Sequence, residues 1–487
     1  MPYRDIREYL SVLETKGKLR RIPKRVDPSW EVSCIARWMY QAFADENRFG
    51  LFFENIQGYD IPVMTGVLGA SRETYAIALE TVPDQINAKW VHALSNPIEP
   101  ELTDSAPCQE VIIQGDDVDL GVLPIPVWTP GKDAAPYITS TTISRDHDTG
   151  IQNTAVYRTM VKDRNHVAVN LVPARHGSLC YASYVNKGKA APFAWVLGAE
   201  PVVHLAAVAN VQYGIDELTI AGGLKGAPIK VAKAKTVDLL VPAHAEIIIE
   251  GTIQPGAVDQ EGPFGEFAGY MRSAGKNPVA TVTAITHRRN PIYYGHISQM
   301  PPSESTVMQS LGYAGFVLKM LRHDLGYKTV KDVHVDLTYG GVLAHGIVSM
   351  KPQYPGHAVR VGRAMANETT LKRITVVDDD IDIRDPMHMD WAMNSRMNPA
   401  RDTIIIDRIF AGARMDPTVH ARNGEIEMSS KLLIDATDKS GRSDFSLPPK
   451  ELMMKALDSW KKTGLPDFKI PKRTQYLLDR EESSRAK

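Results

Sequence analysis

The sequence predicts a mixed α/β protein of several domains, with helices towards both ends and many short strands in the middle. Its 487 residues are too many for one hydrophobic core and suggest about two to four domains. In residues 108–296, runs rich in β-branched side chains alternate with glycine, proline and asparagine, a pattern typical of a barrel or a sandwich. Beyond residue 330, strand and helix patterns alternate, which indicates a layered α/β domain.

The composition is that of an ordinary soluble globular protein, with 43% hydrophobic and 23% charged residues. A net charge of −1 gives no reason to expect nucleic acid or an anionic membrane as a partner. The charged N-terminus is unlike a signal peptide, and no stretch approaches the ~18 to 20 apolar residues of a membrane span. Cys34, Cys108 and Cys180 lie far apart, so we expect no disulfide framework and a reducing, cytoplasmic location.

Residues 1–107 are predicted to form an N-terminal α/β segment. Apolar residues at helical spacing predict one helix over residues 3–18, which Gly17 ends, and another over 31–45. The apolar face expected for the second helix consists of Cys34, Ile35, Trp38 and Met39. The other elements predicted here are strands over 51–53 and 62–64 and helices over 72–81 and 82–94.

The rest of the chain is predicted to continue as a strand-rich domain, a connecting helix, a C-terminal domain and a tail. These parts span residues 108–296, 297–330, 331–465 and 466–487. Strands of the strand-rich domain are expected over 111–113, 140–144, 155–160, 166–171, 193–197, 230–232, 246–250, 279–287 and 292–294. The connecting helix is expected over 303–324, and the tail is expected to be a polar, frayed end.

The most informative stretch runs from Glu261 to Glu266, where two carboxylates stand among residues that are otherwise almost all apolar. Gly262, Pro263 and Gly265 make a regular helix or strand unfavourable, so a shaped turn is predicted. Such a turn can place both acids at the wall of an apolar cleft, where desolvation makes one of them a proton donor near neutral pH. The alternative is a surface turn with two solvated glutamates.

Three further segments carry candidate ligands for an ion or a phosphate. Asn153 and Arg158 stand an odd number of residues apart on a predicted strand and would face opposite ways, unless this is an edge strand with a solvated arginine. His176 is predicted in a turn after a strand, and Glu217 precedes an apolar run; both could also be plain surface residues. If gathered in space, an amide oxygen, an imidazole and a carboxylate make a site suited to Mn²⁺ or Mg²⁺.

Two other stretches give weaker indications. The glycine-rich run over 221–226 matches neither a dinucleotide fingerprint nor a P-loop, so it does not predict nucleotide binding of those kinds. Three aspartates over 378–380 follow a predicted strand and indicate either a cation site or a solvated turn.

Taken in order, these segments resemble the UbiD family of prenylated-FMN-dependent decarboxylases. No single segment is specific, but the ordered set extends over most of the chain. The matching segments are 3–10, 55–59, 153–158, 175–176, 216–217, 241–251, 261–266, 300–302, 377–382 and 391–392. The resemblance implies a split β-barrel flavin-binding domain that a helix joins to a C-terminal α/β oligomerisation domain.

The resemblance also implies cofactors and the residues that hold them. Asn153, His176 and Glu217 match the family's Mn²⁺ ligands, and the cofactor phosphate completes the coordination. K⁺ is expected near the carbonyls of residues 206–209, although this segment lacks the hydroxyl side chain found in some members. The residues that match the prenylated-FMN site are Asn153, Val156, Tyr157, Arg158, Asn170, Leu171, Val172, Arg175, His176 and Glu217.

The catalytic group implied by the resemblance is Arg158 with Glu261 and Glu266. Arg158 would orient the substrate carboxylate and keep Glu261 ionised, while Glu266 would donate the proton that replaces CO₂. The expected function is reversible non-oxidative decarboxylation of an aromatic or heteroaromatic acid, with hydroxybenzoate-like acids favoured. The expected assembly is a homo-oligomer, a dimer or a hexamer, with a flavin prenyltransferase as cofactor supplier. The alternatives are a flavin-binding partner without catalysis and a metal-only decarboxylase.

Overall fold

The computed structural model describes residues 2–337, 344–410, 416, 418–419, 428–439 and 445–485, apart from the side chains of 410 and 480–485. It divides into two compact units. Unit 1 contains the described residues up to Phe316 together with Leu337 and Asp416, and unit 2 contains the others from Val317 on. The division falls inside helix α8 (Glu304–Lys319), within the segment predicted as the connector. The finer domain boundaries expected from the sequence stay a prediction.

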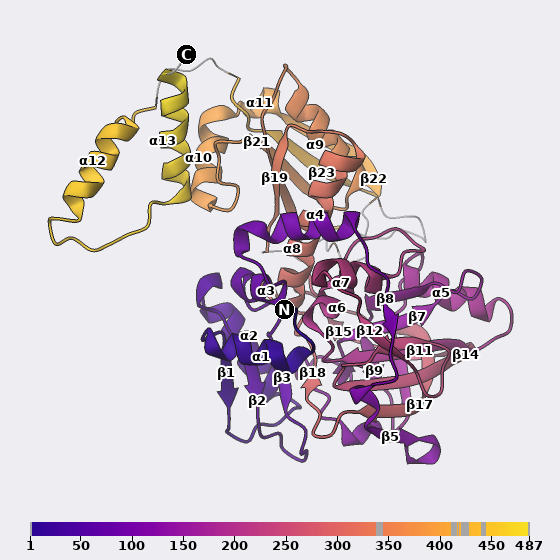
Figure 1. Ribbon diagram of the computed structural model, residues 1–487. Coiled ribbons are helices and arrows are strands. Elements are labelled where there is room, and N and C mark those ends of the chain that lie inside the picture. Colours follow the sequence, from indigo (N-terminus) through magenta and orange to yellow (C-terminus); the bar gives the residue numbers. More distant parts are fainter. Residues whose placement is uncertain are drawn as a thin grey trace. The chain divides into compact units, whose positions relative to one another are not determined.

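The first part of unit 1 places helices beside a small four-stranded sheet (Figure 1). The sheet order is β1 (Leu19–Ile22), β2 (Gly50–Phe53), β3 (Val63–Thr65) and β18 (Tyr293–Tyr294). The helices are α1 (Ile6–Thr15), α2 (Glu31–Ala42), α3 (Arg72–Ala78) and α4 (Ile86–Ser95). As predicted, α1 precedes a left-handed Gly17; it begins after Asp5, whose carboxylate accepts hydrogen bonds from two backbone N–H groups.

The apolar face predicted for α2 is right for Met39 and wrong for Trp38. Its buried residues are Val32, Ser33, Ala36, Met39 and Tyr40, whereas Trp38 is 72% exposed. Tyr40 decides the rotation of the helix, because its buried hydroxyl donates a hydrogen bond to the carbonyl of Gly69 at 2.9 Å. The rotation leaves Cys34, Arg37 and Gln41 on a face that lines a cavity.

The centre of unit 1 is a curled nine-stranded sheet, which confirms the predicted split β-barrel within an α/β fold. The long pair β14–β17 is bent by register shifts at Gly251 and after Ile253. The strand order is β6 (Tyr137–Ile138), β9 (Thr159–Val161), β10 (His166–Val169), β17 (Gly275–His287), β14 (Ile247–Glu261), β11 (Ala191–Leu197), β7 (Thr141–Arg145) and β8 (Gln152–Val156), with β5 (Val111–Gln114) beside β17.

Smaller elements complete unit 1. Two small sheets consist of β13 (Leu240–Pro242), β12 (Lys230–Lys233) and β4 (Glu101–Leu102), and of β15 (Phe264–Gly265) and β16 (Met271–Arg272). Further helices are α5 (His176–Val185), α6 (Pro201–Ala206) and α7 (Glu217–Lys225). Short 3₁₀ turns lie at Asp45–Asn47, Pro83–Gln85, Pro107–Gln109, Gly115–Asp117 and Leu120–Val122.

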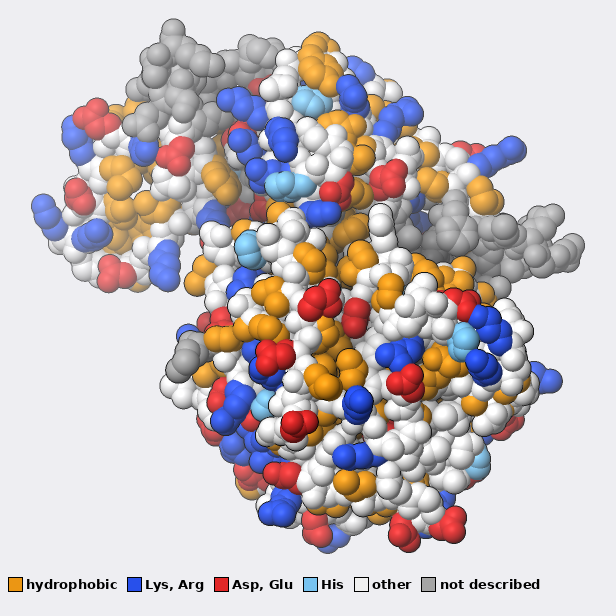
Figure 2. Space-filling model, turned by 45° about the vertical axis from the view of Figure 1, so that its right-hand side comes forward, with side chains coloured by type: hydrophobic (Ala, Val, Ile, Leu, Met, Phe, Trp, Pro, Cys, Tyr) orange, Lys and Arg blue, Asp and Glu red, His pale blue; other side chains and the backbone are white. Residues whose placement is uncertain are grey.

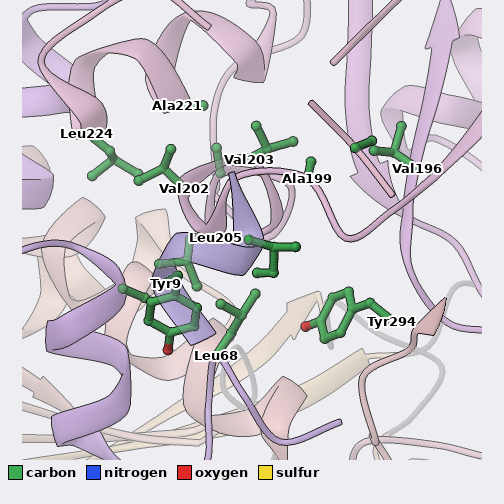
Figure 3. Close-up of a cluster of buried hydrophobic side chains, with 14 of the residues drawn as sticks. Tyr9, Leu68, Val196, Ala199, Val202, Val203, Leu205, Ala221, Leu224 and Tyr294 are labelled. Carbon is green, nitrogen blue, oxygen red and sulfur yellow. The ribbon is translucent and has the colours of Figure 1, made fainter. Parts of the chain in front are cut away.

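Unit 1 is held together by buried apolar side chains from segments far apart in the sequence. Figure 3 shows Val202, Val203 and Leu205 of α6 among side chains of α1, α7 and β11. Each fully buried residue of this kind contributes about 1.5–3 kcal/mol to folding. Helix α8 packs closely on Trp90, because a Cβ at Gly315 would lie 2.3 Å from the Trp90 Cβ. The glycines of α8 are therefore packing residues.

Unit 2 is a five-stranded sheet with helices, as the alternating sequence pattern predicts. The order is β19 (Val330–Val335), β20 (His345–Met350), β21 (Arg373–Asp378), β23 (Met428–Asp435) and β22 (Thr403–Phe410), and the three central strands are parallel. The helices are a π-helical segment (Met320–Asp324), α9 (His357–Glu368), α10 (Pro386–Arg396), α11 (Pro399–Asp402), α12 (Lys450–Trp460) and α13 (Lys472–Arg485). The tail is polar as predicted, but residues 472–485 form a helix, which the sequence did not predict; the fraying expected around Arg485 stays a prediction.

Of the three aspartates over 378–380, Asp379 is exposed in a turn, as one of the two predictions has it, whereas Asp378 and Asp380 form neither predicted feature. Arg396, whose side chain is fully buried at the end of α10, donates to Asp378 Oδ2 and to both carboxylate oxygens of Asp380, each at 2.7 Å. Its Cζ also lies 5.2 Å from the centre of the Trp391 ring. Both aspartates are thus engaged in an internal ion-pair network that ties α10 to the end of β21.

The surface carries charges of both signs, and the described helices are short or polar. On the face drawn in Figure 2, acidic and basic side chains are interspersed, in keeping with the net charge of −1. Within the described ranges, every helix is too short or too polar to traverse a lipid bilayer.

Candidate active site

One guanidinium bridges the two glutamates of the 261–266 turn. Arg158 Nη2 donates to Glu261 Oε2 at 2.8 Å, and Nη1 donates to Glu266 Oε1. Glu261 is the fully buried last residue of β14, and Glu266 follows five residues later beyond β15 with a side chain 13% exposed. The alternative of two solvated glutamates is therefore wrong.

Arg158 does not lie on the strand that the sequence predicts. The expected strand over 155–160 is interrupted, because β8 ends at Val156 and β9 begins at Thr159. The interruption turns Arg158 inwards, where it is 9% exposed and its Cζ lies 5.1 Å from the centre of the Phe264 ring. The alternative of a solvated edge-strand arginine is wrong as well.

Glu261 is surrounded by hydrogen-bond donors. Its Oε1 accepts from the Tyr137 hydroxyl at 3.1 Å, and its Oε2 accepts from the amides of Asn170 and Asn277 at 3.2 and 3.1 Å. Burial raises the pKa of Tyr137, so this hydroxyl keeps its proton and remains a donor. Donors on both oxygens stabilise a negative charge on Glu261.

Glu266 has a different environment. Burial raises the pKa of Glu266, and Arg158 and Arg272 only partly offset this. Burial also opposes the charge on Arg158, but Glu266 and Glu261 outweigh that effect and raise the pKa of the guanidinium. The two acids thus share one cation but differ in their surroundings, because Glu261 accepts from three further donors while burial favours a proton on Glu266, and acid–base chemistry requires such an asymmetry.

Glycines give the turn its close packing. A Cβ at Gly265 would lie 2.5 Å from Thr129 Oγ1 and 2.8 Å from Gln299 Cγ, and one at Gly269 would lie 2.8 Å from Met300 Sδ. Only glycine permits this approach without displacing a neighbour. The backbone on both sides of Glu266 is therefore fixed against the 299–300 segment.

The three residues predicted as metal ligands lie at one place in unit 1, on β8, α5 and α7. Glu217 Oε2 accepts a hydrogen bond from the backbone N–H of Thr154, next to Asn153, at 2.6 Å. His176 Nδ1 lies 3.7 Å from Glu217 Oε1. Glu217 is 2% exposed, so it is not the plain surface residue of the alternative reading.

The donor set fits a divalent ion. Asn153 Nδ2 donates to Ser144 Oγ at 3.2 Å and to the Tyr157 hydroxyl at 3.3 Å, which turns Oδ1 the other way. That Oδ1 is buried and accepts no hydrogen bond in the described part of the chain. A buried acceptor of this kind, beside an imidazole and a carboxylate, suits a cation such as Mn²⁺. Among the described residues, no group of three or more His, Cys, Asp or Glu side chains is placed to hold a metal ion. The set proposed here has only two such side chains, and its third donor is the amide of Asn153.

Tyr157, one of the residues predicted to line a flavin site, joins β8 to the start of α5. The Tyr157 hydroxyl accepts a hydrogen bond from the backbone N–H of Gly177 at 2.8 Å, and Gly177 permits the contact because a Cβ there would lie 2.5 Å from the Tyr157 ring. The prediction that His176 lies in a turn is wrong. His176 begins α5, and Arg175 is the N-cap residue of that helix. Asn170 and Leu171 are buried, Val156 and Val172 half-buried, and Arg175 exposed.

The sequence did not indicate every contributor. Tyr137, Asn277 and Arg272 contact the two glutamates but come from separate strands, with no local pattern to single them out. The expected K⁺ segment over 206–209 begins at the end of α6, where the carbonyl of Ala206 accepts from the N–H of Ala209 at 2.9 Å. K⁺ binding there stays a prediction.

Comparison with known proteins identifies the family. Profiles of 3-octaprenyl-4-hydroxybenzoate carboxy-lyase match its N-terminal domain to residues 10–94, its Rift-related domain to 101–301 and its C-terminal domain to 306–436. The chain belongs to the UbiD family. This family assignment confirms the resemblance inferred from the ordered motifs.

Solved structures extend the similarity over nearly the whole chain. An evolved dimeric form of the UbiD-class enzyme HmfF from Pelotomaculum thermopropionicum, in complex with prFMN, is 34% identical, covers 92% of this chain and 97% of its own, and has a TM-score of 0.81. Vanillic acid decarboxylase from Sedimentibacter hydroxybenzoicus is 28% identical over 95% and 100%, with a TM-score of 0.82. The 3,4-dihydroxybenzoic acid decarboxylase AroY from Klebsiella pneumoniae is 25% identical over 93% and 99%, with a TM-score of 0.80. This UbiD-family protein is therefore a carboxy-lyase.

Proposed function

We propose that this UbiD-family enzyme catalyses the reversible, non-oxidative decarboxylation of an aromatic or heteroaromatic acid, with prenylated FMN and Mn²⁺ as cofactors. The observation that carries the proposal is the unequal carboxylate pair: Glu261 surrounded by donors, Glu266 with a raised pKa, and Arg158 between them. Hydroxybenzoate-like acids are favoured as substrates. Two relatives named above are decarboxylases of vanillic acid and of 3,4-dihydroxybenzoic acid.

Each member of the group has a distinct task. Arg158 binds and orients the substrate carboxylate, and Glu261 holds the guanidinium in place and keeps it charged. When the bond between ring carbon and carboxylate breaks, CO₂ leaves and the electron pair stays with the ring carbon. Glu266 then donates its proton to that carbon, and solvent restores the proton. In the reverse direction Glu266 removes the ring proton before CO₂ adds.

Asn153, His176 and Glu217 would hold Mn²⁺, and the N-terminus of α5 beside Arg175 would meet the cofactor phosphate. When bound, prenylated FMN supplies an electron sink for a negative charge that an sp² carbon cannot bear alone. Tyr157 and Asn170 would contact the cofactor.

We also propose K⁺ near residues 206–209, a flavin prenyltransferase as the cofactor source and a cytoplasmic location. The protein would assemble as a homo-oligomer, a dimer or a hexamer, through unit 2.

The test is direct. Purified protein matured with a flavin prenyltransferase should release CO₂ from at least one member of a panel of aromatic acids. In D₂O and at high CO₂, it should also exchange ring hydrogen of the decarboxylated product for deuterium. Failure of both reactions across the panel would refute the proposed function.

The two alternatives give different results in the same preparation. A flavin-binding partner without catalysis would retain the cofactor yet be indifferent to loss of Arg158 or Glu261. A metal-only decarboxylase would be colourless and active. A visible spectrum, the intact mass of the released cofactor and one activity assay separate the three possibilities.

A further inference from the structure

Glu266 also lines a cavity of about 560 Å³ in unit 1, on the side of helix α2. Its other walls include Arg37 and Gln41 of α2, Trp128 and the 299–300 segment. The volume lies within the range of about 300–1,000 Å³ that is usual for small-molecule sites. The reaction derived above uses only Glu266 among the residues that line this cavity. The other lining residues therefore indicate what kind of ligand fits.

Arg37 brings a cation into the cavity wall without an acidic partner. Its Nη1 donates to the carbonyl of Met300, and its Nη2 donates to Gln299 Oε1 at 3.4 Å. Throughout the described ranges, no carboxylate lies within ion-pair distance of this guanidinium. Burial lowers the pKa of Arg37 to about 10, so it stays protonated at neutral pH. A guanidinium has more N–H donors than these two bonds use.

Gln299 adds a second donor with spare capacity. Its Oε1 accepts from the backbone N–H of Ser298 at 3.0 Å as well as from Arg37, which fixes the orientation of the amide. Its Nε2 is buried and has no acceptor among the residues that the structure describes. The backbone of Gln299 also has a positive φ of 34°, a strained conformation that is found mostly at functional sites. The wall thus holds the guanidinium of Arg37 and, on Gln299, an amide nitrogen that has no acceptor among the described residues and is shielded from solvent.

The remaining walls suit a flat apolar ring. Trp128 and Met300 lie on the cavity together with Tyr270 and Met271. Lys132 adds a second positive charge, and Glu266, whose raised pKa favours its neutral form, is the acid among the lining residues. An apolar space with cations at its wall is complementary to an aromatic anion.

We propose that this cavity receives the ring end of an aromatic acid that carries a second anionic substituent, and that Arg37 binds that substituent with help from Gln299. The inference rests on the proposed function and deepens it: the preferred substrates are aromatic dianions, such as dicarboxylates. Arg37 determines specificity and takes no part in breaking the carbon–carbon bond.

The experiment compares benzene-1,3-dicarboxylate and benzene-1,4-dicarboxylate with benzoate. Binding to the cofactor-free protein is measured by titration calorimetry, and kcat and KM are measured for the matured enzyme. Wild type should prefer a dicarboxylate, and R37M should lose that preference by on the order of 10–100-fold, as expected for charge-assisted hydrogen bonds. The loss should appear in Kd and KM, with kcat changed little. R37K, which keeps the charge but not the planar fork, should retain part of the preference.

The matched control is K24Q, which removes a positive charge from the 72%-exposed side chain of Lys24, just before α2 and outside the cavity. It should leave the preference unchanged. The proposal is overturned if wild type binds benzoate as tightly as both dicarboxylates, if R37M keeps the preference, or if K24Q abolishes it. If no acid is turned over but the binding preference and its loss in R37M are observed, the proposed function fails and the binding site stands.

Discussion

Each unit of this protein contains a buried arginine between two carboxylates, and the two sites differ in what they leave available. In unit 2, Arg396 uses both terminal nitrogens on aspartates, and its side chain is completely shielded from solvent. In unit 1, Arg158 joins Glu261, which accepts hydrogen bonds from several other donors, to Glu266. Glu266 has a raised pKa and lines a cavity. Even the aromatic neighbours are alike, with Cζ to ring-centre distances of 5.1 and 5.2 Å. Residue types alone therefore do not distinguish a structural network from a reactive one; access to a cavity and a carboxyl with a raised pKa do.

The largest expected effect tests which network is reactive. E266Q keeps the shape of the side chain but removes its proton donor, so decarboxylation should fall by about 10²–10⁴-fold, the usual contribution of general acid catalysis. The absorbance of bound cofactor should persist. D380N in the unit 2 network is the matched control and should keep the wild-type rate per folded molecule. Full activity of E266Q would refute the assigned proton donor.

A second effect tests which network is structural. R396M leaves Asp378 and Asp380 facing each other without their shared cation, which should lower the free energy of unfolding by about 3–5 kcal/mol. R158M should cost less, because Glu261 keeps the donors Tyr137, Asn170 and Asn277. Urea unfolding of both variants measures the difference. An equal or larger loss in R158M would contradict the comparison.

A smaller effect concerns the metal side of the unit 1 site. S144A removes the hydroxyl that accepts from Asn153 Nδ2, so the amide is oriented less firmly and Mn²⁺ affinity should fall about 10-fold. Titration of the metal-free protein with Mn²⁺ measures this change. S11A, on the outer face of α1, is the control; an unchanged affinity in S144A would argue against the assigned ligand.

The smallest effect is a pH dependence of the unit 1 network. Because the pKa of Glu266 is raised by burial, its proton is lost at a higher pH than in the unfolded chain. The rate of decarboxylation should therefore decline on the alkaline side, as pH rises through this pKa. Between the pKa of Glu266 in the unfolded chain and its raised pKa in the folded protein, the folded state binds more protons than the unfolded state. The contribution of this carboxyl to the free energy of unfolding therefore falls as pH rises through that interval. A rate profile without that decline would contradict the assignment.

Local patterns predicted much of the fold. The helical spacing of Ile6, Tyr9 and Leu13 and the cap at Asp5 specify α1 within a few residues, because their physics is local. The orientation of α2 could be predicted only in part, since Met39 faces inwards as expected, but Tyr40 does so through a contact with a distant segment, while the larger Trp38 stays outside. Hydropathy describes the side chain itself but not the residues that it contacts in the folded protein.

The candidate site shows the same limit. The turn at Glu261 was visible because glycine and proline restrict the backbone directly. The inward turn of Arg158 was not, because the break between β8 and β9 has no proline or glycine to indicate it. Arg37 and Gln299 stand 262 positions apart and meet only in the folded chain. The family resemblance supplied roles for residues whose proximity the sequence could not establish.

The tight fit of Gly265 has a consequence for how this enzyme can diversify. Any side chain at this position would push on Thr129 and Gln299 together, disturbing the proton donor and the cavity wall in one step. Helix α2 borders the same cavity with Cys34 and with Gln41, an exposed residue whose amide donates to the carbonyl of Pro301 at 3.1 Å through a longer, more adaptable side chain. New substrate preferences are therefore expected to evolve by exchange of side chains along α2, while the glycine turn stays constant.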